Sequence, residues 1–217
     1  MKKLFKLITF TLILLLFTSF ISCSSTQSKS RTLDTLSLKE GTLVAPARFN
    51  GKWGVMTSSG EWVFDPTSDI TALRDFHEGL ALACNKCQEW GYINPYGEWV
   101  IKPKFEFNES DYEPSDSTNF NDGRALLKET GKDYGYIDKS GDYVIEPQFD
   151  WASPFNEGVA TFLHRKNNIF YEFINPNGEI LLIIEDQNSF EMVSDFSEDL
   201  IAKENDNGKM GFINIYG

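Results

Sequence analysis

Residues 90–103 read WGYINPYGEWVIKP, and the same order of residue types recurs along the chain. The other copies are KWGVMTSSGEWV at 52–63, YGYIDKSGDYVIEP at 134–147, YEFINPNGEILL at 171–182 and MGFINIYG at 210–217. The glycine that closes the central turn stands at positions 60, 97, 141, 178 and 217, so neighbouring copies are spaced by 37, 44, 37 and 39 residues. A fixed motif at near-constant spacing indicates a structural repeat.

A second motif alternates with the first. It reads FHEGLA at 76–81, FNDGRA at 120–125, FNEGVA at 155–160 and FSEDL at 196–200. Because the two motifs keep their order over residues 51–217, we interpret this segment as stacked copies of one small unit.

Each copy of the first motif is typical of a β-hairpin. Pairs such as Tyr-Ile and Val-Ile, bounded by glycine and proline, predict short strands. Between them, Asn94-Pro95-Tyr96-Gly97 has the residues of a type I turn, with Asn first, Pro second and Gly fourth. The second motif adds a bend and a further strand, so the sequence predicts about three strands for each repeat of ~37 residues.

The combined pattern resembles the WG-repeat family, which is named for its recurring Trp-Gly pair. The resemblance covers residues 46–217 and implies four repeats and part of a fifth. It implies an all-β array of short antiparallel hairpins, stacked or curved like a solenoid, with closure into a propeller as the alternative. The third and fourth copies depart from the pattern: Tyr134 and Tyr171 replace Trp, Glu172 replaces Gly, and Asp199 replaces the glycine of the second motif.

Residue types that recur once per repeat are expected to build the scaffold, because chemistry needs one site whereas stacking needs many. The expected scaffold residues are Trp53, Gly54, Trp90, Gly91, Tyr134, Gly135, Gly79, Gly123 and Gly158. We interpret the aromatic members as packing residues, the alternative being an exposed ladder that binds sugar rings. The recurring acids stand beside turns, where a carboxylate accepts backbone N–H groups; they are Glu78, Asp122, Glu157 and Glu198.

The first 22 residues are typical of a bacterial export signal, since Lys2, Lys3 and Lys6 precede a short apolar run at 7–17. Residues 20–23 (FISC) resemble the lipobox of bacterial lipoproteins, which implies lipidation of Cys23. A plain signal peptide and an uncleaved anchor are the alternatives. We therefore predict a signal peptide at 1–22, a lipid-anchored flexible tether at 23–45 and a repeat domain at 46–217, held in the bacterial cell envelope at the outer membrane or cell surface.

Composition and motifs exclude several classes of function. The 217 residues are 41% apolar, enough for a core, and carry a formal net charge of −12. This acidic balance argues against nucleic acid as a partner, because phosphate recognition needs clustered Lys and Arg. The chain has no nucleophile elbow, HExxH sequence, P-loop or dinucleotide fingerprint, so we predict no catalytic residue, cofactor or metal.

Two features fall outside the repeat. Cys84 and Cys87 stand in a loop between expected strands, where an oxidising compartment favours a disulfide between them. A thioredoxin-like pair, and a zinc site that adds His77 and His164, are the alternatives. Residues 105–119 make the longest departure from the period, and this acidic insertion holds Glu106, Glu109, Asp111, Glu113 and Asp116. Insertions in repeat arrays often lie on the binding face, so we expect a partner to bind here, a solvated loop or a calcium site being the alternatives.

These observations predict a non-enzymatic, lipid-anchored β-repeat domain that binds an envelope or extracellular partner. The first alternative is a carbohydrate- or cell-wall-binding module that uses Trp62, Trp99 and Tyr143. These aromatics stand two residues after a turn glycine, where strand alternation is expected to direct them outward. A further alternative is an envelope hydrolase, for which the sequence nominates no particular pair of carboxylates.

Overall fold

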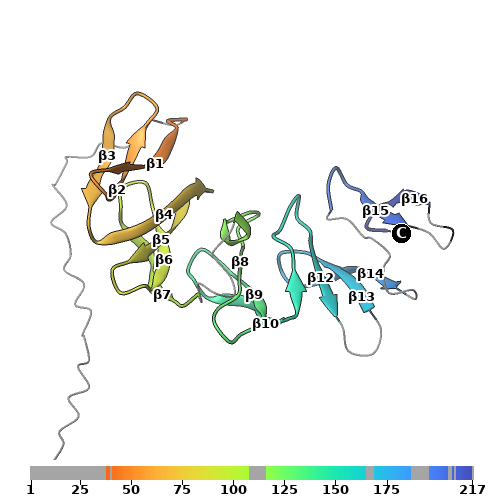
Figure 1. Ribbon diagram of the computed structural model, residues 1–217. Coiled ribbons are helices and arrows are strands. Elements are labelled where there is room, and N and C mark those ends of the chain that lie inside the picture. Colours follow the sequence, from red (N-terminus) through yellow and green to blue (C-terminus); the bar gives the residue numbers. More distant parts are fainter. Residues whose placement is uncertain are drawn as a thin grey trace, which may run out of the picture. The chain divides into compact units, whose positions relative to one another are not determined.

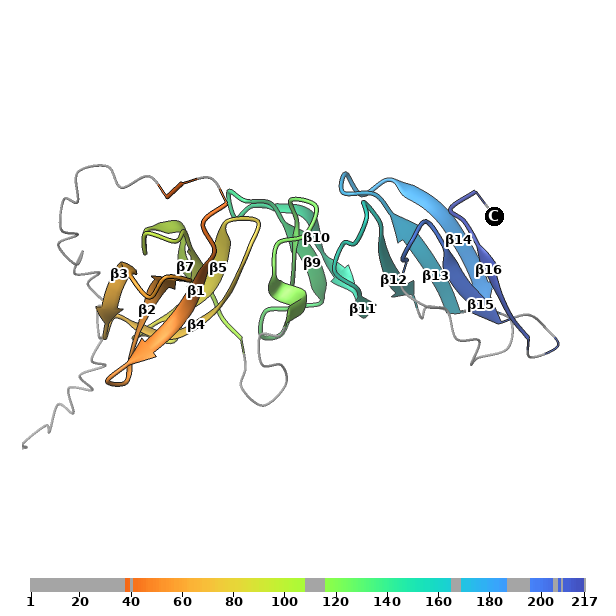
Figure 2. The ribbon, with the colours of Figure 1, turned by 90° about the horizontal axis from the view of Figure 1, so that it is seen from above.

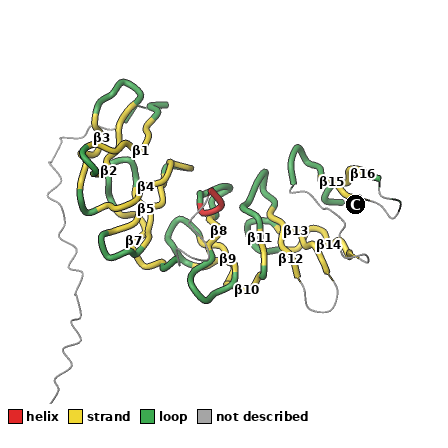
Figure 3. Tube along the Cα trace, in the orientation of Figure 1, coloured by secondary structure: helices red, strands yellow, loops and turns green. Residues whose placement is uncertain are grey.

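Short antiparallel strands make up almost all the secondary structure of the computed structural model (Figures 1 and 3). The structure describes residues 38–39, 41–107, 116–164, 169–186, 196–204, 207 and 209–216. They belong to one compact unit that spans Leu38–Gly217. Within this described part, no helix is long and apolar enough to cross a membrane. The predictions for residues 1–37, including Cys23, and for Glu109, Asp111 and Glu113 lie outside the described residues.

The described strands form five small sheets, numbered here in chain order, in which every paired strand is antiparallel to its neighbour. The first sheet contains β1 (Val44–Phe49), β2 (Lys52–Thr57) and β3 (Trp62–Thr67). The second contains β4 (Ile70–His77), β5 (Leu80–Asn85), β6 (Trp90–Ile93) and β7 (Trp99–Phe105). A short 3₁₀ turn, η1 (Asp116–Thr118), precedes the third sheet, which contains β8 (Ala125–Leu127), β9 (Tyr134–Ile137) and β10 (Tyr143–Phe149).

The fourth sheet contains β11 (Trp151–Ala152), β12 (Ala160–His164), β13 (Ile169–Ile174) and β14 (Ile180–Asp186), and Figure 2 shows the last three strands side by side. The fifth contains β15 (Ile201–Glu204) and β16 (Met210–Ile213). These sheets confirm the predicted all-β class of short antiparallel hairpins. The first and third sheets have the predicted three strands, and the second and fourth have four each. The first strand begins at Val44, inside the segment assigned to the tether.

The Trp-Gly glycine is required because the opposite strand bulges over it. On β6 the step from Trp90 to Tyr92 faces the longer step from Ile101 to Phe105 on β7. A Cβ atom on Gly91 would lie 2.8 Å from the nitrogen of Pro103, closer than real Cβ contacts allow. Equivalent crowding holds at Gly54 and Gly135, where the nearest proline nitrogens would be 2.9 and 2.8 Å away. The motif therefore couples a glycine on one strand to a proline-containing bulge on the next.

An Asn–Glu pair closes the turn between the two motif strands. The Asn94 side-chain carbonyl accepts the backbone N–H groups of Tyr96 at 3.0 Å and Glu98 at 3.1 Å. Its amide donates to the Glu98 carboxylate at 2.8 Å. The turn glycine, Gly97, has a φ of +80° and packs against the ring of Phe64 in the preceding sheet. Because both a positive φ and a close neighbour exclude a side chain there, glycine is needed for two independent reasons.

The second motif forms a tight two-residue hairpin turn rather than an open bend. Glu78 and Gly79 have φ values of 48° and 83°, and a positive φ at both central residues is the property of a type I′ turn. Residues 122–123, 157–158 and 198–199 repeat this conformation. A similar sequence that the sequence analysis missed, LKEGTL, stands at 38–43, where Gly41 has a φ of +82° and the Thr42 N–H donates to the Lys39 carbonyl at 2.9 Å.

Successive residues of the central strands point into different hydrophobic cores. On β6, Tyr92 faces the core shared with the third sheet, whereas Ile93 faces the core shared with the first. On β9, Ile137 and Tyr136 divide in the same way between the preceding and following cores. Among the described residues, four such cores join the five sheets. Both faces of a central strand are therefore buried, which explains its continuous apolar sequence.

A buried tyrosine anchors two of these cores in the same way. The Tyr92 ring packs edge-on against Phe120 with centroids 4.9 Å apart, and its hydroxyl donates to the Thr118 carbonyl at 2.7 Å. One repeat later, the Tyr136 ring lies 4.8 Å from that of Phe155, and its hydroxyl donates to the Ser153 carbonyl at 2.7 Å. The aromatic of the first motif and the phenylalanine of the second therefore meet across neighbouring sheets.

Candidate binding site

The recurring acids hold neighbouring repeats together. The Glu78 carboxylate accepts the backbone N–H of Gly123, with its two oxygens at 3.1 and 3.3 Å. The Asp122 carboxylate accepts the N–H of Gly158 at 2.8 Å, and Glu157 accepts that of Asp199 at 3.4 Å. The expectation that these acids bind backbone N–H groups is confirmed for the three, and each donor lies in the next repeat. We call this series the acid ladder.

Other polar contacts join the turns of successive repeats. The Tyr96 hydroxyl accepts the backbone N–H of Leu38 at 2.9 Å, and the Lys139 ammonium lies 3.0 Å from the Glu78 carboxylate. The Arg124 guanidinium donates to the Pro176 carbonyl at 2.9 Å. In each case a second-motif turn meets the first-motif turn of the following repeat. These residues are therefore engaged in stacking the array.

The aromatic residues of the Trp-Gly pairs are confirmed as packing residues. Trp53, Trp90 and Tyr134 are half-buried and pack against three successive cores. Trp62, Trp99 and Tyr143 are half-buried, and the expected outward direction is wrong for Trp99 and Tyr143. Trp99 packs against the core between the first and second sheets, and Tyr143 against the next core. Alternation directs a side chain outward only where one face of the sheet meets water, and stacking covers both faces here.

The predicted Cys84–Cys87 pair stands at the turn between β5 and β6. Cys84 is buried at the inner end of β5, and its thiol donates to the Asn85 carbonyl at 3.3 Å. Asn85 closes the intervening turn, because its side-chain carbonyl accepts the N–H groups of Cys87 at 2.8 Å and Glu89 at 2.9 Å. Among the described residues, no cluster of three or more His, Cys, Asp or Glu side chains could hold a metal ion.

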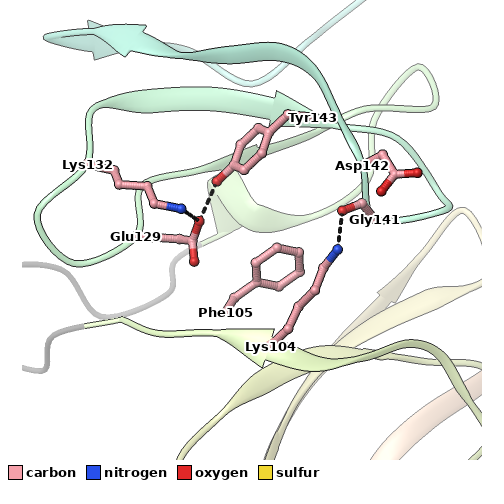
Figure 4. Close-up of a pocket in the computed structure, with 7 residues that line it drawn as sticks. All are labelled: Lys104, Phe105, Glu129, Lys132, Gly141, Asp142 and Tyr143. Carbon is pink, nitrogen blue, oxygen red and sulfur yellow. Dashed lines mark hydrogen bonds and ion pairs between the residues drawn. The ribbon is translucent and has the colours of Figure 1, made fainter.

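A cavity of about 260 Å³ lies between the second and third sheets (Figure 4). The end of β7 contributes Lys104 and Phe105, and the loop after β8 contributes Glu129 and Lys132. The turn before β10 and the first residue of that strand complete the lining with Gly141, Asp142 and Tyr143. The cavity therefore combines two ammonium groups, two carboxylates and two aromatic rings.

Glu129 organises one wall of this cavity. Its Oε1 atom accepts the Tyr143 hydroxyl at 2.8 Å and the Lys132 ammonium at 2.6 Å (Figure 4). The Glu129 side chain is only 12% exposed, whereas that of Lys132 is 50% exposed. Burial raises the pKa of the Tyr143 phenol, and the adjacent Glu129 carboxylate raises it further. At neutral pH the phenol therefore keeps its proton and remains a hydrogen-bond donor.

The opposite wall is held by Lys104. Its ammonium donates to the Gly141 carbonyl at 2.7 Å, which ties β7 to the first-motif turn of the next repeat. This position is not part of the repeat pattern, because Thr67 and Gln148 occupy it in the first and third repeats. Lys104 lies at least 25 residues before Glu129 and Lys132 in the sequence, so no single motif marks the cavity as a unit.

The acidic insertion begins beside this cavity. The Glu106 carbonyl accepts the backbone N–H of Thr130 at 2.9 Å and its hydroxyl at 3.3 Å, and Thr130 follows the cavity residue Glu129. Among the insertion residues singled out earlier, Glu106 is exposed, and Asp116 opens η1. Phe107 packs edge-on against Trp90, with ring centroids 6.0 Å apart. The structure thus places the first residues of the insertion against the loop that forms the cavity.

Comparison with known proteins supports the repeat assignment. The family model described as "WG containing repeat" matches residues 53–86, 90–113 and 134–167. No curated protein matches the chain. Among solved structures, the chain is similar to the computationally designed Ika4 protein, with 13% identity and a TM-score of 0.39 over 71% of this chain and 98% of that one.

A second similar structure is the WD40 β-propeller domain of Doa1, with 11% identity and a TM-score of 0.36. That match covers 82% of this chain and 62% of the Doa1 chain. Each family match begins at an aromatic residue followed by glycine, namely Trp53, Trp90 or Tyr134. The chain therefore contains WG repeats in three segments, at residues 53–86, 90–113 and 134–167.

Proposed function

We propose that this chain is a non-enzymatic binding module, anchored in the bacterial cell envelope by a lipid on Cys23, which holds a partner protein at the cavity beside the acidic insertion. The observation that carries the proposal is the makeup of the cavity. Lys104, Glu129 and Lys132 are outside the repeat pattern, whereas the recurring acids and aromatics are engaged in packing. Side chains that vary between repeats are the ones available for specificity.

The charges of the site define the partner's chemistry. The acidic insertion supplies five carboxylates within 105–119, which favour a basic surface on the partner. The cavity at its base takes a polar side chain or chain terminus, because Lys132 and Glu129 offer adjacent groups of opposite charge. Lys132 is half-exposed, so a partner carboxylate reaches it with little rearrangement.

Chemical cross-linking in intact cells, followed by mass spectrometry, tests this proposal. A discrete partner linked through Lys104, or through Lys128 next to the cavity, is the expected result. Lys132→Ala should reduce its recovery, whereas the matched control Lys86→Ala, which removes a surface ion pair with Asp69 away from the cavity, should not. Equal loss in both variants, or links scattered over the surface lysines, would contradict a partner site here.

Carbohydrate binding is the second candidate, favoured by the rings of Phe105 and Tyr143 in a cavity rich in hydrogen-bonding groups. Retention of the chain on purified cell-wall glycan tests it. Tyr143→Ala should abolish retention, whereas Trp99→Ala, which removes a half-buried aromatic outside the cavity lining, should not do so while the domain stays folded. Equal retention of the Tyr143 variant and the unchanged chain would exclude this candidate.

The anchoring part of the proposal has a separate test. Cells grown with a labelled fatty acid should incorporate it into the chain, and Cys23→Ser should remove the label and release the protein from the membrane fraction. The matched control is Ser22→Ala, which keeps a small residue before the cysteine. Label that persists in the Cys23 variant would contradict lipidation at this residue.

A further inference from the structure

The fourth hairpin departs from the other three at two coupled positions. Glu172 stands where the first three repeats have glycine, and Ile184 stands where they have proline. In the structure, β13 and β14 pair without interruption from Ile169 opposite Asp186 to Phe173 opposite Leu182. Glu172 lies directly opposite Ile183 in this ladder. Because no bulge crosses position 172, the side chain there is tolerated, and the two replacements together straighten the hairpin.

The straight hairpin changes the outer edge of the fourth sheet. In the described part of the chain, β14 pairs with β13 alone and forms the edge of its sheet. The corresponding edges β7 and β10 each carry a bulge and a proline, Pro103 or Pro147, which cannot donate a backbone hydrogen bond. Bulges and prolines on an edge are the features that prevent pairing with another chain.

The edge strand β14 has no proline, and its one register shift lies at its start, between Ile180 and Leu182. Its sequence is ILLIIED, with no glycine, proline or basic residue. Ile180 and Ile183 are 55% and 48% exposed. From Leu182 onward β14 keeps a regular register with β13, and an apolar edge without proline is a template for an additional strand.

We propose that β14 pairs antiparallel with β14 of a second copy of this chain. The direction follows from charge, because both acidic residues, Glu185 and Asp186, stand at one end of the strand. A two-fold pairing centred on Ile183 places each acidic end opposite the apolar end at Ile180, whereas a parallel pairing would align four carboxylates. In a chain with a net charge of −12, this arrangement keeps the acidic ends apart. This inference is independent of the proposed partner site at the cavity.

Sedimentation equilibrium of the full chain in mild detergent is the first test. The expected mass is twice the 24.7 kDa of one chain. Cysteine substitution then locates the contact: Ile183→Cys should give a disulfide-linked dimer under mild oxidation. The matched control is Val144→Cys, at a 39% exposed position on the bulged edge strand β10. This variant should give no disulfide-linked dimer above background. Both variants retain the same three native cysteines, so the difference between them reports the added thiol.

Two further variants test whether the straight edge of β14 causes the dimerisation. The double change Glu172→Gly with Ile184→Pro restores the sequence of the other repeats and should convert the dimer to a monomer. Because Ile184 is buried, Ile183→Lys serves as a second variant that adds charge to the edge with less disturbance to the core, and it should also give a monomer with an unchanged circular dichroism spectrum. A monomeric parent chain, a dimer unaffected by Ile183→Lys, or equal cross-linking at positions 183 and 144 would each overturn the proposal. A monomer that captures an extended peptide at β14 would overturn it as well.

Discussion

The carboxylate of Glu78 accepts a hydrogen bond from the backbone N–H of Gly123, which lies one repeat further along the chain. The acid belongs to one tight turn and the donor to the next, and the relationship recurs from Asp122 to Gly158 and from Glu157 to Asp199. The carboxylate of the second motif therefore links neighbouring repeats. The turn that carries this carboxylate is closed by backbone geometry alone.

Asp122→Ala should destabilise the junction between the third and fourth sheets. The variant loses a 2.8 Å charge-assisted bond to Gly158 and places Ala at a φ of 51°, which Asp and Asn tolerate better. We expect a loss of about 1 kcal/mol in the free energy of unfolding, measured by urea denaturation. Asp122→Asn keeps an acceptor and the tolerance of positive φ, so it should lose clearly less. Equal losses in the two variants would contradict a role for the side-chain bond.

Gly91→Ala should destabilise the second sheet, whereas Gly211→Ala should not. These are equivalent positions in two copies of the first motif, but the bulge of β7 crosses Gly91, and the nearest atom to a Cβ on Gly211 would be the Lys203 carbonyl oxygen at 4.0 Å. Forcing the bulge away from Gly91 costs about 1–3 kcal/mol. The urea midpoints of the two variants measure the contrast, and a Gly91 variant as stable as the parent would disprove the crowding.

Tyr92→Phe should lower stability by about 1 kcal/mol, because it removes a buried 2.7 Å hydrogen bond while keeping the ring. Tyr136→Phe should behave alike, since its hydroxyl makes the same bond to Ser153. Tyr216→Phe is the control, as that side chain is 88% exposed, and it should be neutral. Thermal unfolding of the three variants provides the comparison, and a neutral Tyr92 variant would show that the ring alone anchors the core.

The turn at 138–142 should weaken in acid. The pKa of Asp138 lies below its ordinary value of 3.8, mainly because the Ser140 hydroxyl donates a hydrogen bond to the carboxylate. The backbone N–H groups of Ser140, Asp142 and Gly141 lower this pKa further. A lowered pKa means that the ionised form stabilises the folded state. This contribution is therefore present above about pH 4 and is lost as the pH falls through the pKa of the folded state.

Replacement of Ser140 tests the cause. Ser140→Ala should raise the pKa of Asp138 toward its ordinary value, whereas Ser140→Thr keeps a hydroxyl and should leave it low. An NMR titration that follows the carboxyl carbon chemical shift of Asp138 against pH measures its pKa in both variants. An unchanged titration in the alanine variant would assign the low pKa to the backbone donors instead.

Local features of the fold were predictable because they depend on residues close in sequence. Asn94, Pro95 and Gly97 specify their turn without reference to the rest of the chain. The glycines at 54, 91 and 135 marked positions where a side chain would clash. The similar sequence at 38–43 was missed because Leu38 stands where the second-motif copies have phenylalanine.

Features that depend on stacking were not predictable. The exposure of Trp99 and Tyr143 depends on whether another sheet covers their face, and a single hairpin sequence is the same in either case. The cavity is formed where Lys104 from one repeat meets Glu129 and Lys132 from the next. No spacing rule connects these residues, because their proximity results from the register between sheets.

The alternation of Tyr92 and Ile93 between two cores means that no repeat possesses a hydrophobic core of its own. Each core is formed jointly by two neighbouring repeats. Removing an internal repeat therefore disrupts two cores, whereas removing a terminal repeat disrupts one. A one-residue deletion within β6 would exchange the two faces and disrupt both cores at once. The loops carry no such constraint, which is why an acidic insertion can lengthen one interval to 44 residues while the sheets on either side keep their packing. The array can thus acquire new surface only where its strands end.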